Sequence, residues 1–282
     1  MSAATDNSSG SLSGPLSDAT PGDAPAALEL VRATRRFGGI TAVNDVSIAL
    51  PTGMITGLIG PNGAGKTTVF NMITGFYAPS SGQVRFEGRN ITGMAPHRIC
   101  KLGIARTFQN IRLFSGLSAM ENVMVGGHLR QKSAWWMPPL HLPLVRREEK
   151  ALRENAMLLL ESLGLAKAAH RPAGSLPYGA QRRLEIARAL ATGPNLLLLD
   201  EPAAGMNPQE SAELMDLIRM IRDRYNLTIL LIEHDMKVVM GVCAHIWVLE
   251  YGSCIAEGNP DAIQGDTRVI EAYLGQEYTR HA

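Results

Sequence analysis

The stretch Gly60-Pro61-Asn62-Gly63-Ala64-Gly65-Lys66-Thr67-Thr68 decides how the rest of the chain is interpreted. Its spacing, G-x-x-x-x-G-K-[ST], places glycines where a backbone can wrap tightly around phosphate groups. The backbone N–H groups of such a loop cradle phosphate oxygens, Lys66 supplies a positive charge, and the Thr67 hydroxyl can ligate Mg²⁺. The stretch therefore predicts a phosphate-binding loop.

The segments on either side of this loop support that prediction. Residues Met54 to Ile59 have the pattern of a short buried strand, and Thr67 to Thr74 that of a helix ended by Gly75. A strand, a glycine-rich loop and a helix N-terminus are the parts that an anion site requires. The alternative is a glycine-rich turn with an exposed lysine, and this context disfavours it.

Composition limits the class of protein. The chain has 282 residues, 45% of them hydrophobic, which is enough for a large core in one big domain or two small ones. The formal net charge is +1, so there is no electrostatic reason to expect a nucleic acid as partner. Cys100, Cys243 and Cys254 are far apart in the sequence, so neither a zinc site nor a disulfide framework is indicated.

Membrane-crossing and export signals are also missing from the sequence. No apolar run reaches the roughly 20 residues that cross a bilayer. The N-terminus lacks the basic and apolar regions of a signal sequence. We therefore expect that, if the protein works at a membrane, another subunit holds it there.

Composition also divides the chain into a tail and a folded part. Residues 1 to about 27 are mostly Ser, Ala, Gly, Pro and Asp, and we expect a disordered tail there. Apolar residues then alternate with polar ones at Leu28 to Arg32 and Val46 to Leu50, which predicts antiparallel strands with one face in water. Gln83 to Phe86 follows a turn and adds another strand.

The middle of the chain has helical patterns. From about Ser118 to Ala173 we expect a helical lobe, in which Glu148 to Leu163 alternates charged and apolar residues at turn spacing. Trp135-Trp136-Met137-Pro138-Pro139-Leu140 is apolar but too short and proline-rich for a membrane helix. A packed loop is favoured there because buried tryptophans usually belong to a core. Contact with a partner or with the membrane surface is the functional alternative.

The C-terminal half has the pattern of a parallel sheet. Leu196-Leu197-Leu198-Leu199 is continuously apolar, as in a strand covered on both faces, and Thr228 to Ile232 repeats this pattern. A helix from about Gln209 to Arg224 joins the two and completes a βαβ unit with a right-handed crossover. Strands alternating with helices predict an α/β core.

Polar residues follow each of these apolar strands. Asp200 and Glu201 come after the first, and Glu233-His234-Asp235 after the second. Because ligands bind beyond the carboxyl ends of strands in open α/β sheets, we expect these groups to meet the phosphates at Lys66. Asp200 suits Mg²⁺ binding through water, and Glu201 suits orienting or deprotonating an attacking water. Alone, an Asp-Glu pair is more often a helix cap and a single histidine a surface residue, but the phosphate loop reverses that preference.

With these motifs the chain, from Leu28 to the C-terminus, resembles the ATPase subunits of ABC transporters. The resemblance implies a P-loop NTPase core of the RecA-like type, with an antiparallel β subdomain and a helical subdomain at about residues 110–190. ATP and Mg²⁺ are the implied cofactors. The implied partners are a second ABC ATPase subunit, polytopic membrane permease subunits at the cytoplasmic face of the cell membrane and, indirectly, a solute-binding protein.

The same resemblance implies roles for single residues. Leu196 to Pro202 resembles the Walker B strand, with the catalytic glutamate at Glu201. Thr107-Phe108-Gln109 resembles the Q-loop, whose glutamine reaches the metal and the attacking water and transmits the nucleotide state to the permease. His234 resembles the switch histidine that contacts the γ-phosphate. Phe37 resembles the aromatic that stacks on adenine, with a core phenylalanine as the alternative. The implied metal ligands are Thr67, Gln109 and Asp200.

Leu176-Pro177-Tyr178-Gly179-Ala180-Gln181-Arg182-Arg183 resembles the family's signature segment. The resemblance implies that this segment opens a helix whose N-terminus faces ATP bound on a second subunit, where free N–H groups favour an anion, with Tyr178 and Gly179 at the nucleotide. A proline at 177 replaces the usual serine, so its hydroxyl contact must be missing, although proline suits a first helical turn. Ala180 replaces a common glutamine, and Asn207 replaces a usual aspartate in the loop after Pro202.

Three further segments resemble branched-chain amino-acid importers, and related urea, amide and lipopolysaccharide systems share much of them. They are Ala203 to Pro208, Ile232 to Met236 and Ala272 to Gly275. The resemblance implies an ATPase that drives import through closure of an ATP-bound dimer. The alternative is a soluble ABC ATPase in iron–sulfur assembly, DNA repair or translation. A P-loop kinase or GTPase would leave the signature segment and His234 without roles.

Overall fold

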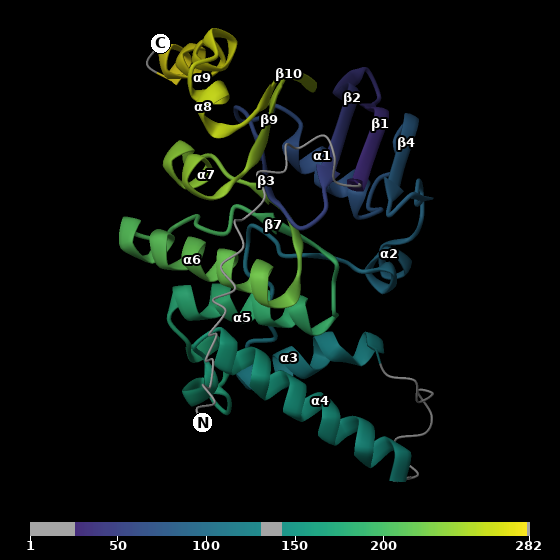
Figure 1. The fold of residues 1–282 in the computed structure, drawn as a ribbon, viewed down its shortest axis with the longest axis vertical. Coiled ribbons are helices and arrows are strands. Elements are labelled where there is room, and N and C mark those ends of the chain that lie inside the picture. Colours follow the sequence, from purple (N-terminus) through teal and green to yellow (C-terminus); the bar gives the residue numbers. More distant parts are fainter. Residues whose placement is uncertain (1–25, 131–142, 281–282) are drawn as a thin grey trace, which may run out of the picture.

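The computed structural model describes residues 26–130 and 143–280, and Figure 1 shows its sheets and the helices around them. One sheet has four antiparallel strands in the order β2-β1-β4-β5. Leu30 at its centre pairs with Ile48 on one side and Val84 on the other. The bounds are β1 Ala26–Phe37, β2 Ile40–Pro51, β4 Ser81–Phe86 and β5 Arg89–Asn90.

The second sheet has six strands in the order β10-β9-β3-β8-β7-β6. Strands β6, β7, β8, β3 and β9 run parallel, and β10 pairs antiparallel with β9. Their bounds are β3 Ile55–Ile59, β6 Ile104–Arg106, β7 Leu196–Asp200, β8 Thr228–Ile232, β9 His245–Glu250 and β10 Ser253–Gly258. The carboxyl ends of β3, β6, β7 and β8 therefore lie along one edge, where the predicted chemical groups follow.

Helices cover this sheet, and three of them, α3, α4 and α5, pack against one another as a helical lobe at the bottom of Figure 1. The α-helices are α1 Lys66–Ile73, α2 Pro96–Leu102, α3 Ala119–Gly127, α4 Pro143–Ser162, α5 Tyr178–Ala191, α6 Pro208–Tyr225, α7 Met236–Val242, α8 Pro260–Gln264 and α9 Thr267–Arg280. Short 3₁₀ turns lie at His128–Arg130, Ala166–Ala168 and Ala173–Ser175. None of the helices in the described ranges has both the length and the apolar character that a bilayer crossing needs.

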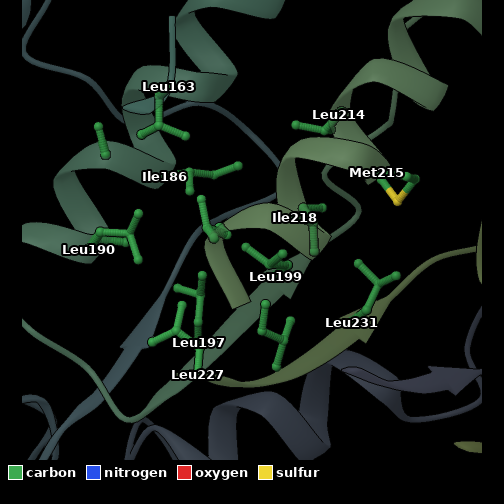
Figure 2. Close-up of a cluster of buried hydrophobic side chains, with 14 of the residues drawn as sticks. Leu163, Ile186, Leu190, Leu197, Leu199, Leu214, Met215, Ile218, Leu227 and Leu231 are labelled. Atoms are coloured by element: carbon green, nitrogen blue, oxygen red, sulfur yellow. The ribbon is translucent and has the colours of Figure 1, made fainter. Parts of the chain in front are cut away.

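The continuous apolar run of β7 is explained by burial on both faces. Leu197 and Leu199 belong to a cluster that includes Ile186 of α5 and Ile218 of α6, as Figure 2 shows. The alternate residues Leu196 and Leu198 belong to a second cluster formed with α1 and the antiparallel sheet. Because side chains alternate along a strand, only an all-apolar strand serves both cores.

The architecture confirms the predicted α/β fold, with antiparallel β1 and β2 and a β7-α6-β8 unit. Strand β1 begins at Ala26, two residues before the expected start of the folded part, because Ala26 pairs with Pro51. The expected tail otherwise lies outside the described residues, and so does the segment Trp135 to Leu140.

Candidate functional site

The phosphate loop connects the end of β3 to α1, and its glycines are required by close backbone contacts. Gly60 has φ +146°, and a Cβ there would lie 2.0 Å from the Leu249 carbonyl oxygen. Gly65 has φ +101°, and its Cβ would lie 2.5 Å from the Ala42 carbonyl oxygen. Within the loop, Pro61 and Ala64 are buried, whereas Asn62, Gly63 and Thr67 are exposed and Thr68 is half-buried. The loop is therefore fixed from behind and open in front.

Lys66 is the buried cation of this loop, only 7% exposed. Its Nζ donates hydrogen bonds to the carbonyl oxygens of Gly60 at 2.6 Å and Pro61 at 2.9 Å. Burial lowers the pKa of Lys66, while the charges of Glu201 and Asp200 act in the opposite direction. Neutral carbonyls hold an ammonium less strongly than phosphate oxygens do, so this cation is available to a phosphate.

Asp200, at the end of β7, forms a buried ion pair that the sequence did not reveal. Its Oδ2 lies 2.7 Å from Nη2 of Arg106, with each side chain 7% exposed. Nη1 of Arg106 donates to Oδ1 of Asn71 on α1 at 2.7 Å. Arg106 thus ties β6, β7 and the phosphate-loop helix together, and any metal at Asp200 would share the carboxylate with this guanidinium.

The predicted metal ligands have the oxygen chemistry that Mg²⁺ prefers. The Thr67 hydroxyl, the Gln109 amide and the Asp200 carboxylate are hard oxygen ligands of the kind that Mg²⁺ prefers. Among the described residues no group of three or more His, Cys, Asp and Glu side chains could hold a metal by itself. This arrangement suits an ion that takes its remaining ligands from phosphates and water.

The structure brings together the three predicted catalytic residues. Nε2 of Gln109 donates to Oε2 of Glu201 at 2.8 Å, and Nδ1 of His234 lies 3.6 Å from the same oxygen. Glu201 has the left-handed φ of +45°, and its N–H bonds to the Ile232 carbonyl at 2.9 Å. His234 is exposed, with 59% of its side chain accessible. A carboxylate, an amide and an imidazole therefore face the same space beyond the strand ends.

Glu233 was expected to face the phosphates with His234 and Asp235, but its carboxylate is turned into the protein instead. It is 1% exposed. Its Oε1 accepts from the Ala203 N–H at 2.9 Å and its Oε2 from the His234 N–H at 3.2 Å. Burial raises the pKa of this carboxyl group. Glu233 thus joins the loop after Glu201 to the loop that carries His234, and only its position between apolar Ile232 and His234 could have suggested this.

The signature segment lies at the surface, at the start of α5. Pro177 is the N-cap, one residue before the helix rather than in its first turn, and it makes no side-chain cap. Tyr178 is 45% exposed and Gly179 half-buried. Leu184, Ile186, Ala187 and Leu190 form the buried side of this helix. The free N–H groups of this helix end are therefore accessible from outside the chain.

Phe37, the predicted adenine-stacking residue, ends β1 and is 38% exposed. This exposure excludes the alternative that it is a core residue. Tyr77 contacts it edge-on with ring centroids 5.1 Å apart, and the Arg35 guanidinium lies 4.5 Å from the ring centroid. Stacking on adenine stays a prediction.

Family models and curated relatives identify the class of protein to which this site belongs. Residues 43–204 match the family described as "ABC transporter", and residues 253–279 match "Branched-chain amino acid ATP-binding cassette transporter". The chain is 47% identical over 249 residues to the high-affinity branched-chain amino acid transport ATP-binding protein BraF of Pseudomonas aeruginosa, covering 88% of this chain and 98% of the relative. It is 47% identical over 241 residues to LivG of Escherichia coli, which carries the same description, covering 86% and 94%.

Solved structures give the same assignment. The ADP conformation of MJ1267, an ATP-binding cassette of an ABC transporter, superposes with a TM-score of 0.78 at 32% identity, covering 89% of this chain and 99% of that one. A nucleotide-free cassette from an ABC transporter superposes with a TM-score of 0.77 at 32% identity, covering 88% and 98%. The chain therefore belongs to the ABC transporter family and is an ABC-type ATPase.

Proposed function

We propose that this chain is the ATP-hydrolysing subunit of an importer for branched-chain amino acids. The observation that carries the proposal is the convergence of Lys66, Asp200, Glu201, Gln109 and His234 beyond one edge of the parallel sheet. The names of the relatives, BraF and LivG, supply the class of transported solute. They favour transport over iron–sulfur assembly, the soluble alternative.

The chemical step is assigned to residues of this chain. The loop amides and Lys66 would bind the β- and γ-phosphates, and Thr67, Gln109 and Asp200 would hold Mg²⁺. Bound Mg²⁺ supplies charge that offsets the negative charge developing on the phosphate oxygens. Glu201 takes the proton of the attacking water, while Gln109 holds that carboxylate through their 2.8 Å bond. His234, which follows β8 at the same edge of the sheet, would contact the γ-phosphate.

A second ATPase subunit completes the nucleotide site. The exposed start of α5 presents free N–H groups that favour an anion, but it lies far from the phosphate loop in the sequence and is not part of that local loop. Two chains facing each other would place the α5 start of one against the phosphates held by the other. We propose that closure and reopening of this pair move the helical lobes.

An apolar groove supports docking of a permease segment. A cavity of about 370 Å³ lies between α2, α3, α5 and the residues after β6. Its rim carries exposed aromatic side chains, with Phe76 at 53% and Phe114 at 52%. Arg106 and Phe108 of the predicted Q-loop region also line it, so an occupant would touch the segment that carries Gln109. We propose that permease subunits hold the protein at the cytoplasmic face of the membrane, with a solute-binding protein acting through them.

Uptake by intact cells tests the proposal. Cells lacking the subunit should recover uptake of leucine, isoleucine and valine with the wild-type chain but not with Lys66→Ala. This substitution removes the buried ammonium group of the phosphate loop, and no other lysine among the described residues is buried. Lys167→Ala removes an exposed lysine of the helical lobe and serves as the matched control. Unchanged branched-chain uptake without the subunit, together with lost uptake of urea or amides, would show that the solute class is wrong. Normal ATP hydrolysis by Lys66→Ala would overturn the ATPase assignment.

A further inference from the structure

Five hydrogen bonds form a closed circuit through Glu201. Gln109 Nε2 donates to Glu201 Oε2 at 2.8 Å, and the Gln109 carbonyl accepts from Nη2 of Arg182 at 2.8 Å. The same Nη2 lies 3.2 Å from the Tyr178 hydroxyl, which donates to the Ala204 carbonyl at 2.9 Å. The Ala204 N–H donates to the Glu201 carbonyl at 3.2 Å, which closes the circuit. The signature segment, the Gln109 segment and the loop after Glu201 are thereby joined within one chain.

Arg182 is the fixed point of this circuit. Its side chain is fully buried and forms an ion pair with Glu185 at 3.0 Å. Its Nη1 also donates to the Phe108 carbonyl at 2.7 Å. A buried guanidinium with these partners cannot move far without leaving polar groups unpaired, which is costly in a low-dielectric interior. Tyr178 is the exposed and replaceable member, because only its hydroxyl crosses to the loop after Glu201.

One residue of the circuit, Glu201, has a strained backbone conformation. Glu201 adopts φ +45°, a conformation that residues other than glycine avoid and that persists only when neighbouring contacts hold it. The Tyr178 hydroxyl is the side-chain anchor of Ala204, and its ring lies 3.7 Å from the position that a Cβ on Gly205 would occupy. Holding Ala204 therefore holds the turn that aims the Glu201 carboxylate.

We propose that Tyr178 is a positioning residue for hydrolysis. Through its hydroxyl and Arg182 it holds the Glu201 turn of its own chain, besides any contact that the start of α5 makes with ATP on a second subunit. This inference rests on the proposed ATPase mechanism. It assigns to the tyrosine a function that a glycine or serine at this position could not perform, because neither side chain reaches the Ala204 carbonyl and Arg182 together.

Replacing one hydroxyl tests the proposal in the full-length protein. Tyr178→Phe keeps the ring beside Gly205 and removes only the hydrogen bonds to Ala204 and Arg182. We expect kcat for ATP hydrolysis to fall about fivefold, the effect of one net hydrogen bond, because only the bond to Ala204 reaches the Glu201 turn. KM for ATP should stay within about twofold. Tyr225→Phe is the matched control, since its hydroxyl bonds Ser162 at 3.0 Å outside the circuit, and it should leave kcat unchanged.

Hydrogen exchange separates positioning from loss of structure. In Tyr178→Phe the amides of residues 201–206 should exchange faster, while those of β7 and β8 keep their protection. Equal kcat values in Tyr178→Phe and Tyr225→Phe would overturn the proposal, as would a loss carried entirely by KM, which would mean that the phenol binds nucleotide. Glu201→Gln distinguishes a failure of the Tyr178 proposal from a failure of the ATPase mechanism on which it rests. If it is inactive while Tyr178→Phe is normal, only the circuit is wrong, and if it is fully active, the ATPase mechanism itself is wrong.

Discussion

The phosphate loop and the start of α5 are the two parts of the chain that the proposed mechanism places against ATP, and they are held in different ways. The loop is fixed by its backbone, since a Cβ on Gly60 or Gly65 would lie 2.0 or 2.5 Å from a carbonyl oxygen. Tyr178 is held by side-chain hydrogen bonds and is 45% exposed. Steric exclusion leaves one conformation, whereas each hydrogen bond contributes only about 1 kcal/mol net and can be exchanged.

This difference matches two different tasks. A preformed loop binds phosphates without spending binding energy on ordering itself. A segment that meets its ligand only when two subunits close must instead be able to rearrange. In the proposed mechanism the chain therefore combines a rigid half-site, the phosphate loop, with an adjustable one, the start of α5, and changes to each should have different consequences.

The largest effect is expected from Glu201→Gln, which keeps the rigid half-site and removes its base. Glutamine has nearly the same shape and can still accept the Gln109 hydrogen bond, but it cannot take a proton from water. We expect turnover to fall about 10³-fold while ATP binding is retained, so that an ATP-bound dimer accumulates. Steady-state hydrolysis and light scattering with ATP measure the two effects.

Glu271→Gln, which changes an exposed carboxylate of α9, is the control for this variant. It should hydrolyse ATP at the wild-type rate. A Glu201→Gln protein that stays monomeric with ATP would contradict the idea that closure precedes hydrolysis.

The next effect tests whether the rigid half-site also depends on side chains. In Arg106→Met the buried Asp200 carboxylate loses its partner at 2.7 Å. Breaking a buried pair in this way should lower the free energy of unfolding by about 3–5 kcal/mol, measured by urea denaturation. Arg153→Met breaks an exposed i,i+4 pair with Glu149, 59% exposed on both sides, and should cost about 0.5 kcal/mol. Equal small effects would mean that the backbone alone fixes the loop.

The rigid half-site was predictable from the sequence, and the reason is local. The loop, β3 and α1 lie within about 20 consecutive residues, so spacing alone defines their geometry. Glu201 and His234 were placed by a second rule, that parallel strands end at one edge of a sheet. Both kinds of prediction use information that lies beside the residue in the sequence.

The ties between segments were not predictable, because they join single residues far apart in the chain. Arg106 and Asp200 are 94 positions apart, and Arg182 reaches the Gln109 carbonyl across 73. The sequence around a single arginine does not indicate which acceptor its guanidinium will bind in the folded chain. The start of α5 was placed one residue early for a related reason, since Pro177 suits both the N-cap and the first turn and only the folded chain distinguishes them.

The smallest effect concerns the adjustable half-site and follows from that N-cap. Pro177 has φ −56° and ψ 153°, which serine can also adopt, so Pro177→Ser should leave the fold intact. Serine adds a side-chain cap worth about 1 kcal/mol, partly offset by the freedom that the unfolded chain regains when proline is removed. Thermal stability should therefore change little.

The hydroxyl of Pro177→Ser would face the phosphate of a partner-bound ATP. In a Glu201→Gln background the ATP-dependent dimer should therefore tighten about threefold, which sedimentation can measure. Ser175→Ala, just outside the helix, provides a comparison, and unchanged dimer affinity in Pro177→Ser would mean that the α5 amides alone recognise the phosphate.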